Sequence, residues 1–373
     1  MNDSTSYIAE SADVLVPAAV QSDYAADAVT SLAAVSDDWG TLERRSNNAT
    51  VFQTYSWCSA WLSAAAKVGH PQRPLIVRVR IHGKTVLIWP LCRSVLVGCR
   101  ILHALGEPAT QYCDALVTSD CDNSQAVASA WKLVTSRTDI DLLSLRRIRD
   151  DAAISAIPPF AAVASNDVAP FLDLSVAAGT KHWSGRRRRE LTRCRRKLSA
   201  YGEVELMPVL DPSDKIRAVD HAVTLKRAWM RRRGLWSGGY AHPAANAFTR
   251  SIAPDSSFKV FVLKAGSELA AIETGYVLDK TYWALTRSYD DRFAAMAPSH
   301  LITQQTVDHF ARLGLTRYDL LPPCQPYKMD WSTGTVGVRD VLSPLTWLGV
   351  LFARTSRVAW PAIKRLLGHV ALR

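Results

Sequence analysis

The sequence lacks the features of an exported or membrane-spanning protein. No apolar run reaches the roughly 20 residues that a membrane-spanning helix needs, although 48% of the 373 residues are hydrophobic. The first thirty residues are rich in Ala, Ser and Asp and lack the basic start of a signal peptide. We therefore expect residues 1–30 to be a disordered leader and the protein to be cytoplasmic.

The cysteines lack the spacing of a disulfide framework or of a metal site. There are seven of them, an odd number, and no two form a Cys-x-x-Cys pair or a metal-binding pattern with histidines. No arrangement of His and Asp can be tied to any one cysteine as a nucleophile. We expect a reducing compartment and no metal.

Acidic residues are scarce relative to basic ones in only one segment. Between Lys181 and Arg233 there are 16 Lys and Arg against six Asp and Glu, so this segment accounts for ten of the eleven net positive charges. Its centre, residues 185–198, reads GRRRRELTRCRRKL. The explanation of the charge must therefore be local.

Helical and extended patterns alternate in the same order along both halves, which predicts a mixed α/β fold. Each half has a helix, two strands joined at a glycine (Gly83 and Gly266), a third strand, a second helix and a short buried strand. An aspartate, Asp141 or Asp319, opens that last strand. The repeated order predicts a duplicated unit.

The same patterns divide the chain. The expected parts are the leader at 1–30, a first unit at 31–170, a second unit at 171–345 with a basic helix at 184–201, and a basic amphipathic tail at 346–373. We expect the tail to pack against the protein, or alternatively to rest on a membrane surface as a peripheral contact, without spanning it.

Four motifs follow one another in the second half. They are Tyr289-Asp290, Ala297-Pro298-Ser299, the strand from Gly314 to Asp319, and Tyr327-Lys328-Met329-Asp330-Trp331. The second motif places a proline and a capping residue where a strand hands over to a helix, and such a turn can bind a phosphate through its free N–H groups.

In the order and spacing of these motifs the chain resembles the GNAT-type acyltransferases, and specifically the CelD-like group linked with cellulose and exopolysaccharide biosynthesis. The resemblance covers roughly residues 180–345, and the first half fits the degenerate N-terminal unit of that family. Two departures stand out: Ser299 and Pro322-Pro323 occupy places where glycine is common in the family.

The resemblance implies two tandem GNAT-like units, each a mostly antiparallel mixed sheet flanked by helices, as in Fem-type transferases. It also implies transfer of an acyl group from acetyl-CoA or another acyl-CoA to an amine or hydroxyl of a small-molecule or saccharide acceptor. The cleft is expected between the two units.

Four residues are candidates for catalysis in such a site. Lys328 is expected to contact a phosphate or the developing oxyanion, and Tyr327 to protonate the leaving thiolate. The alternative is that Lys328 is only a surface charge and that Tyr327 is only an aromatic ring in the hydrophobic core. Glu273, on a strand with apolar residues on both faces, is a candidate general base, with an ion pair to Arg287 as the alternative. Asp319 is expected to orient Lys328 or Tyr327.

The donor phosphates are assigned to the loop and turn before the second helix of this half. The candidate residues are Ala297, Pro298, Ser299, His300 and Arg292. His300 stands at the helix start, where it can touch phosphate or act as a base; a cap histidine without a role is the alternative.

The basic helix is predicted to begin after Ser184 and to dock through an apolar stripe, Leu191, Cys194, Leu198 and Tyr201. The remaining cations, Arg186, Arg187, Arg188 and Arg189, are then free to bind an anion, and Arg231, Arg232 and Arg233 at the end of the next helix are expected to join them. CoA phosphates or an acidic acceptor are favoured over nucleic acid, and a solvated face is the alternative.

Two rival functions remain open. One is a Fem-type transferase that takes its acyl group from aminoacyl-tRNA, although the basic segment is short for the helical arm of those enzymes. The other is a non-enzymatic module that binds nucleic acid or a membrane surface. The basic helix lacks the interleaved aromatic residues that base stacking requires.

Overall fold

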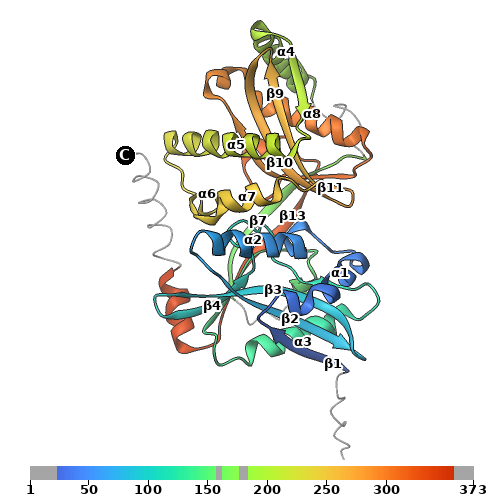
Figure 1. The fold of residues 1–373 in the computed structure, drawn as a ribbon, viewed down its shortest axis with the longest axis vertical. Coiled ribbons are helices and arrows are strands. Elements are labelled where there is room, and N and C mark those ends of the chain that lie inside the picture. Colours follow the sequence, from blue (N-terminus) through green and yellow to red (C-terminus); the bar gives the residue numbers. More distant parts are fainter. Residues whose placement is uncertain (1–22, 157–161, 176–183, 357–373) are drawn as a thin grey trace, which may run out of the picture.

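The computed structural model describes residues 23–156, 162–175 and 184–356. Within these ranges the chain forms two units stacked end to end, each with helices packed against strands (Figure 1). All the strands join one 13-stranded mixed sheet, in the order β1-β2-β3-β4-β6-β13-β7-β12-β11-β10-β9-β8, with β5 paired to β3. The mixed α/β class with a large sheet flanked by helices is confirmed.

The first unit follows the predicted order of elements. Its members are β1 (Tyr24–Val29), α1 (Ser36–Arg45), α2 (Tyr55–Lys67), β2 (Arg73–Ile81), β3 (Lys84–Leu96), β4 (Cys99–Ala104), β5 (Leu116–Val117), α3 (Asn123–Thr135) and β6 (Leu142–Arg149). The β2–β3 hairpin turns at His82 and Gly83, which both have positive φ (48° and 79°), as a two-residue hairpin turn requires.

The second unit repeats this order. Its members are α4 (Gly185–Leu198), β8 (Val204–Pro208), α5 (Pro212–Arg232), α6 (Gly238–Ala241), α7 (Ala244–Ile252), β9 (Phe258–Ala265), β10 (Glu268–Leu278), β11 (Thr281–Tyr289), α8 (Pro298–Arg312), β12 (Arg317–Asp319) and α9 (Pro326–Met329). In both units the third strand pairs in parallel with the short late strand: β4 with β6, and β11 with β12.

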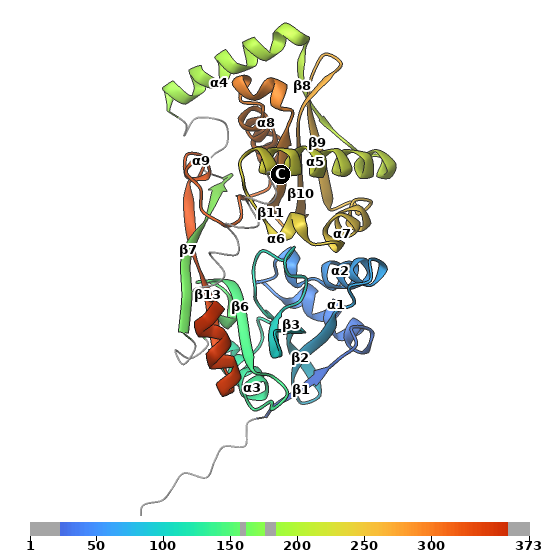
Figure 2. The same cartoon turned by 90° about the vertical axis from the view of Figure 1, so that its left-hand side faces the viewer.

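The two units exchange their last strands. β7 (Ala162–Asp173) follows β6 in the chain but pairs with β12 of the second unit. β13 (Gly334–Pro344) follows β12 but pairs with β6 of the first unit, and β7 and β13 pair with each other. Figure 2 shows these two long strands side by side along one edge of the molecule. The expected boundary at residue 170 therefore does not separate two independent folds.

Aromatic side chains from both units also share one core. Trp57 of α2 packs edge-to-face on Phe248 of α7, with ring centroids 4.7 Å apart, and Phe52 meets Trp283 of β11 at 5.9 Å. All four residues are buried in the same hydrophobic cluster. The two units are thus joined by apolar burial as well as by strand pairing.

The end of the expected leader is a strand rather than a disordered segment. Residues Tyr24–Val29 form β1, which pairs with β2 at the edge of the sheet. Asp27 of β1 forms ion pairs with Arg78 and Arg80 of β2. Because alanine is a weak strand former, the sequence YAADAV concealed this strand, and residues 1–22 lie outside the described ones.

Helix α4 begins and docks as the sequence predicts. The Ser184 hydroxyl accepts a hydrogen bond from the Arg187 backbone N–H at 3.3 Å, which caps the helix. Leu191, Cys194 and Leu198 are buried, while Tyr201 is half exposed against Phe293. The helix packs its apolar stripe against the second unit next to α8.

The described part of the tail packs on the first unit. The chain is helical from residue 347 to 356, and Leu348, Phe352 and Ala353 contact a cluster that contains Ile101 and Leu142. None of the helices within the described ranges is long and apolar enough to cross a membrane. The rest of the expected tail, residues 357–373, lies outside the described part of the chain.

Candidate active site

A cavity of about 1220 Å³ lies between the two units where β11 and β12 stop pairing. The parallel pairing extends only from Thr281–Trp283 to Arg317–Asp319. The residues that follow in each strand, Ala284–Tyr289 and Leu320–Pro323, line the cavity instead. Since ordinary ligand sites have roughly 300–1,000 Å³, this one has room for a large ligand or for two smaller ones.

The lining of the cavity is strongly cationic. Its basic residues are Arg146, Arg147, Lys226, Arg227, Arg233, Arg287 and Lys328, and Glu107 is its one acidic residue. Within the described ranges, only Arg146 (4.0 Å to Asp340) and Arg287 (2.7 Å to Glu273) reach a carboxylate. Arg147, Lys226 and Lys328 are at least partly buried without a counter-charge among the described residues, which is costly, whereas Arg227 and Arg233 are exposed. The lining is therefore complementary to an anionic ligand.

Lys328 of α9 is one of these cations and is nearly buried, with 9% of its surface exposed. Its Nζ donates hydrogen bonds to the carbonyl oxygens of Leu321 at 2.6 Å and Pro323 at 3.0 Å. Burial, reinforced by the Arg287 guanidinium, lowers the pKa of the Lys328 ammonium to about 7. The side chain that the sequence places at the strand mouth therefore lines the cavity and is poised between its charged and neutral forms.

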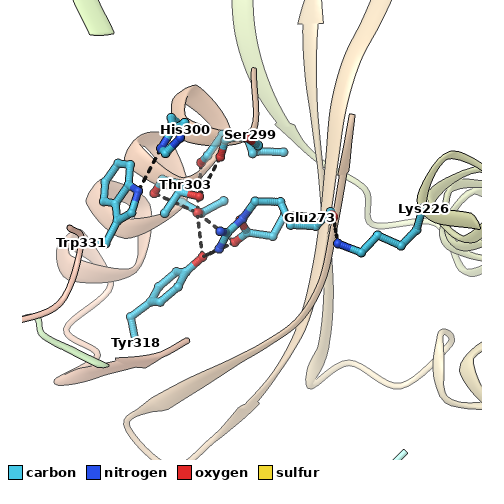
Figure 3. Close-up of polar contacts among 10 residues, drawn as sticks. Lys226, Glu273, Ser299, His300, Thr303, Tyr318 and Trp331 are labelled. Carbon is cyan, nitrogen blue, oxygen red and sulfur yellow. Dashed lines mark hydrogen bonds and ion pairs between the residues drawn. The ribbon is translucent and has the colours of Figure 1, made fainter. Parts of the chain in front are cut away.

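Glu273 is completely buried and is not among the residues that line the cavity. Figure 3 shows its polar contacts. Its Oε2 accepts from Arg287 Nε at 2.7 Å, and its Oε1 accepts from Thr306 at 3.0 Å and from the Tyr318 hydroxyl. Although burial opposes the charge of Arg287, Glu273 raises the pKa of that guanidinium. This geometry corresponds to the ion pair named as the alternative, and it gives the carboxylate no access to a ligand in the cavity.

Asp319 is also fully buried, and it joins the first unit to the wall of the cavity. Its Oδ1 accepts from the Tyr112 hydroxyl at 2.8 Å and from the Leu321 N–H at 2.9 Å. Its Oδ2 lies 3.4 Å from Arg149 Nη1. Leu321 has a positive φ of 59°, which is strained for leucine. Asp319 thus bonds to the backbone of Leu321, whose carbonyl accepts from the Lys328 ammonium, and its negative charge opposes the lowering of the Lys328 pKa.

The start of α8 borders the cavity through Ser299 and His300. Ala297 has left-handed backbone angles (φ 47°), and its carbonyl accepts from the N–H groups of His300 and Leu301. Pro298 has no N–H, so Ser299 keeps the one N–H of this turn that bonds to no described residue. The expected phosphate site is reduced to a single backbone donor.

Arg292, which the sequence assigns to phosphate, is not part of the cavity lining. Its guanidinium lies 2.9 Å from both Glu268 and Asp290, and its plane covers Phe293. With two carboxylates beside it, this arginine has its charge already compensated.

The basic residues of α4 and of the end of α5 also lie outside the lining. Arg186, Arg188 and Arg189 are exposed on α4, and Arg232 forms an ion pair with Asp291 at 2.9 Å. Of the arginines at the end of α5, Arg233, and neither Arg231 nor Arg232, lines the cavity.

Arg187 differs from its neighbours on α4. It is partly buried, its guanidinium lies 4.5 Å from the ring centroid of Trp331, and its Nη2 lies 3.2 Å from His300 Nδ1. Trp331 stacks on the His300 ring, and Tyr327 lies near the same ring at 6.4 Å. Tyr327 itself lines the cavity and is 37% exposed.

Several cavity residues were missed from the sequence. Lys226 projects from α5, where burial and Arg287 lower its pKa to about 8 and its Nζ lies 4.7 Å from the Trp229 ring centroid. Arg147 comes from the first unit with φ 57°, and burial lowers its pKa. Lys226 lies on a helix, and the periodicity of that helix does not show which of its faces meets the cavity. Arg147 belongs to a strand of the other unit.

In the part of the chain that the structure describes, no group of three or more His, Cys, Asp or Glu side chains is placed to hold a metal ion.

Comparison with known proteins defines the second unit. Residues 185–329 match the family model of the acetyltransferase (GNAT) domain. A search of curated protein sequences gave no match. The matched range contains α4, the open gap between β11 and β12, and Lys328, so one side of the cavity lies in a region that is similar to the GNAT acetyltransferase domain.

Solved structures share the fold of the whole chain. The crystal structure of FemX matches with a TM-score of 0.56 at 8% identity, covering 85% of this chain and 97% of that one. A conserved protein of unknown function from Bacteroides thetaiotaomicron gives 0.54 at 11% identity, with 84% and 97% covered. The C-terminal domain of a putative lysylphosphatidylglycerol synthetase from Agrobacterium fabrum gives 0.50 at 12%, with 87% and 97% covered. At these identities the likeness is one of fold, and it extends over both units.

Proposed function

We propose that the protein is an acyltransferase that moves an acyl group, acetyl in the simplest case, from acyl-CoA to an amine or hydroxyl acceptor bound in the cavity. The observation that carries the proposal is the open gap between β11 and β12 in a GNAT domain, facing a cavity whose cations largely lack acidic partners. The resemblance to the CelD-like group suggests a saccharide or cell-envelope acceptor.

The chain's own groups suit a CoA thioester. Phosphate groups need cations, and Lys226, Arg227 and Arg233 of α5 line the cavity without a carboxylate in ion-pair range among the described residues. The Ser299 N–H adds one backbone donor at the positive end of α8. The cavity volume accommodates a donor and an acceptor together.

Lys328 is the proposed general base. A neutral lysine amine has two N–H bonds and one lone pair. The carbonyls of Leu321 and Pro323 accept hydrogen bonds from these two N–H groups. The lone pair is then left to take a proton from the amine or hydroxyl that receives the acyl group. Its pKa of about 7 puts the base in working form at neutral pH.

Tyr327 is the proposed acid for the departing thiolate. It lines the cavity on the same short helix as Lys328, and its partial exposure leaves the hydroxyl accessible to a ligand. Glu273 and Asp319 are proposed as positioning residues, the first through Arg287 and the second through the loop at Leu321.

Calorimetric titration with CoA, acetyl-CoA and a longer acyl-CoA tests the donor assignment. We expect micromolar to sub-millimolar affinity that falls as salt is raised, since cations on the protein would contact the phosphates. A Lys226→Met variant should bind more weakly, and an Arg44→Gln variant, altered on an exposed part of α1, should bind as the wild type. No binding at millimolar CoA would remove the donor.

A second candidate is transfer from aminoacyl-tRNA, because FemX shares the fold of the whole chain. The described residues between β7 and β8 hold the single helix α4, which is short for a tRNA-binding arm. Parallel incubations with labelled acetyl-CoA and labelled aminoacyl-tRNA distinguish the two donors. Label released only from the charged tRNA would replace the first proposal with the second.

A further inference from the structure

One ring nitrogen of His300 is the acceptor of two hydrogen bonds. Its Nδ1 lies 3.0 Å from the indole Nε1 of Trp331 and 3.2 Å from Nη2 of Arg187 (Figure 3 shows the indole contact). Indole and guanidinium nitrogens only donate hydrogen bonds. Nδ1 must therefore carry its lone pair, and the proton of the neutral ring must be on Nε2.

The surroundings keep this ring neutral. Burial, followed by the cations Arg187 and Arg287, lowers the pKa of His300 to about 4, while Asp330 and Glu190 act weakly in the opposite sense. The ring also stands in the first turn of α8, where the helix dipole opposes a positive charge. A proton on Nδ1 would in addition point at the N–H groups of Trp331 and Arg187, which would repel it.

The other nitrogen is free for a ligand. His300 lines the cavity, and among the described residues Nε2 makes no hydrogen bond. It is also absent from the buried polar atoms of the described chain that lack a partner, so it is accessible. The N–H at Nε2 is therefore an unused donor at the edge of the cavity, close to Tyr327.

We propose that His300 acts as a neutral hydrogen-bond donor through Nε2 to the acyl oxygen that becomes negatively charged during transfer, and that Arg187 and Trp331 are the positioning residues that fix this tautomer. The part about the acyl oxygen rests on the proposed acyltransferase activity. The part about the tautomer rests on the two contacts at Nδ1 alone. His300 is then excluded as a general base, since its one free nitrogen already holds the proton.

This inference also explains one residue of the arginine run. Arg186, Arg188 and Arg189 are exposed, whereas Arg187 turns toward Trp331 and lies 3.5 Å from Asp330. The Ser184 cap and the buried stripe of α4 fix the rotation of the helix that brings Arg187 to this place. Helix α4 thus contacts the His300 site through Arg187. The inference does not account for the charge of Arg186, Arg188 and Arg189.

Nitrogen-15 NMR of the full-length protein with labelled histidine rings tests the tautomer without any activity. The chain has nine histidines, so a His300→Gln variant identifies the signal. We expect Nδ1 of His300 to show the shift of an unprotonated nitrogen, unchanged from pH 8 to 5.5. Arg187→Gln should make this ring titrate at a higher pH or mix its tautomers, and Arg186→Gln should leave it unchanged. A wild-type ring that titrates near pH 6.5, or that carries its proton on Nδ1, overturns the inference.

Kinetics test the donor role. Loss of a single donor to a developing oxyanion typically costs about 100-fold or more in kcat, so His300→Phe should lose this much with little change in KM. His300→Gln, whose amide can occupy the position of Nε2, should recover part of the loss. Full activity in His300→Phe overturns the donor role. If no donor substrate supports turnover while the NMR signature holds, the proposed function and the oxyanion role both fail and the tautomer assignment stands.

Discussion

The two units have the same order of elements but treat the gap between their parallel strands differently. In the first unit, β4 ends at Ala104 and α3 begins only at Asn123, and the segment between them folds back over the gap. The Cys113 N–H bonds to the Arg147 carbonyl of β6, and Tyr112 and Cys113 are buried. In the second unit, α8 begins at Pro298, soon after β11, and the gap opens into the cavity.

This difference shows that the connection after the third strand, more than the fold, decides in which unit the gap between the parallel strands stays open. The filled unit is still part of the site, because residues 107–111 and Arg146 and Arg147 line the opposite wall of the cavity. Tyr112 and Arg149 also hold Asp319, beside the loop that positions Lys328. The second unit supplies the open gap. The first unit supplies one wall of the cavity and the side chains that hold Asp319 in place.

The strongest way to break the comparison is to separate the units. Residues 184–373 expressed alone should fail to fold, because β12 loses β7 and β13 loses both of its partners. We expect no cooperative transition in a thermal melt followed by circular dichroism. Co-expression of residues 1–183 should restore a complex that co-purifies and melts cooperatively. An isolated second unit that melts cooperatively and binds CoA would show that the exchange is dispensable.

Breaking the ion pair under the open gap should have the next largest effect. Glu273→Gln leaves Arg287 buried beside a neutral amide, and the loss of one partner of a buried pair costs roughly 3–5 kcal/mol of unfolding free energy. Glu268→Gln, on the same strand but in an exposed pair with Arg292, should cost less than about 1 kcal/mol in chemical denaturation. A stable Glu273→Gln protein with a displaced pH–rate profile would instead restore Glu273 as the base.

Lys328 sharpens the comparison because a second buried lysine offers a matched control. Lys328→Met should lower kcat by about 100-fold or more, as expected for loss of a general base. Lys215 of α5 is likewise buried and donates to two carbonyls, those of Asp255 and Phe258, but it lies outside the cavity lining. Lys215→Met should reduce stability while the folded fraction keeps its turnover. Equal loss of turnover in both variants would mean that Lys328 only supports the fold.

The pH dependence follows from the same residue. Because the lysine pKa is lowered to about 7 and its neutral form is the active one, kcat should rise with pH through about 7 and then level off. Stopped-time assays from pH 5.5 to 9 measure this rise. A rate that is flat across this range, or that falls as Lys328 loses its proton, would assign the amine to charge stabilisation instead.

The smallest expected effect tests the wall from the first unit. Arg147→Gln should raise KM for the donor or acceptor by about 10-fold, with kcat little changed, because it removes uniform binding of an anion. The effect should shrink at high salt. Arg44→Gln, on the exposed part of α1, serves as the control. An unchanged KM would leave the first unit as scaffold only.

Much of the fold was readable from local pattern. The hairpin glycines, the Ser184 cap and the repeated order predicted the units, and Ser299 of the predicted turn and the Tyr327–Lys328 pair border the cavity. Ser299 does not cap α8, because Ala297 is the N-cap residue. The exchange of β7 and β13 was not readable, because strand alternation shows which residues form a strand and not which distant strand is its neighbour.

The catalytic candidates divide along the same line. Lys328 lies on α9, one short loop after strand β12, and its place near the strand mouth follows from local order. The tautomer of His300 depends on Arg187 and Trp331, which approach from two other elements, and no spacing in the sequence reveals that meeting.

The exchange of strands also delays the pairing of β6 and β7 while the chain is being synthesised. As the chain leaves the ribosome, β6 emerges with one edge bare, and its neighbour β13 is not made until residue 344. β7 likewise waits for β12, which follows nearly the whole second unit. Exposed strand edges invite pairing with other chains. The open edge of β6 in the nascent first unit therefore stays unpaired until the second unit has been made, and deleting either half of the chain would leave strands of the other half without their neighbours.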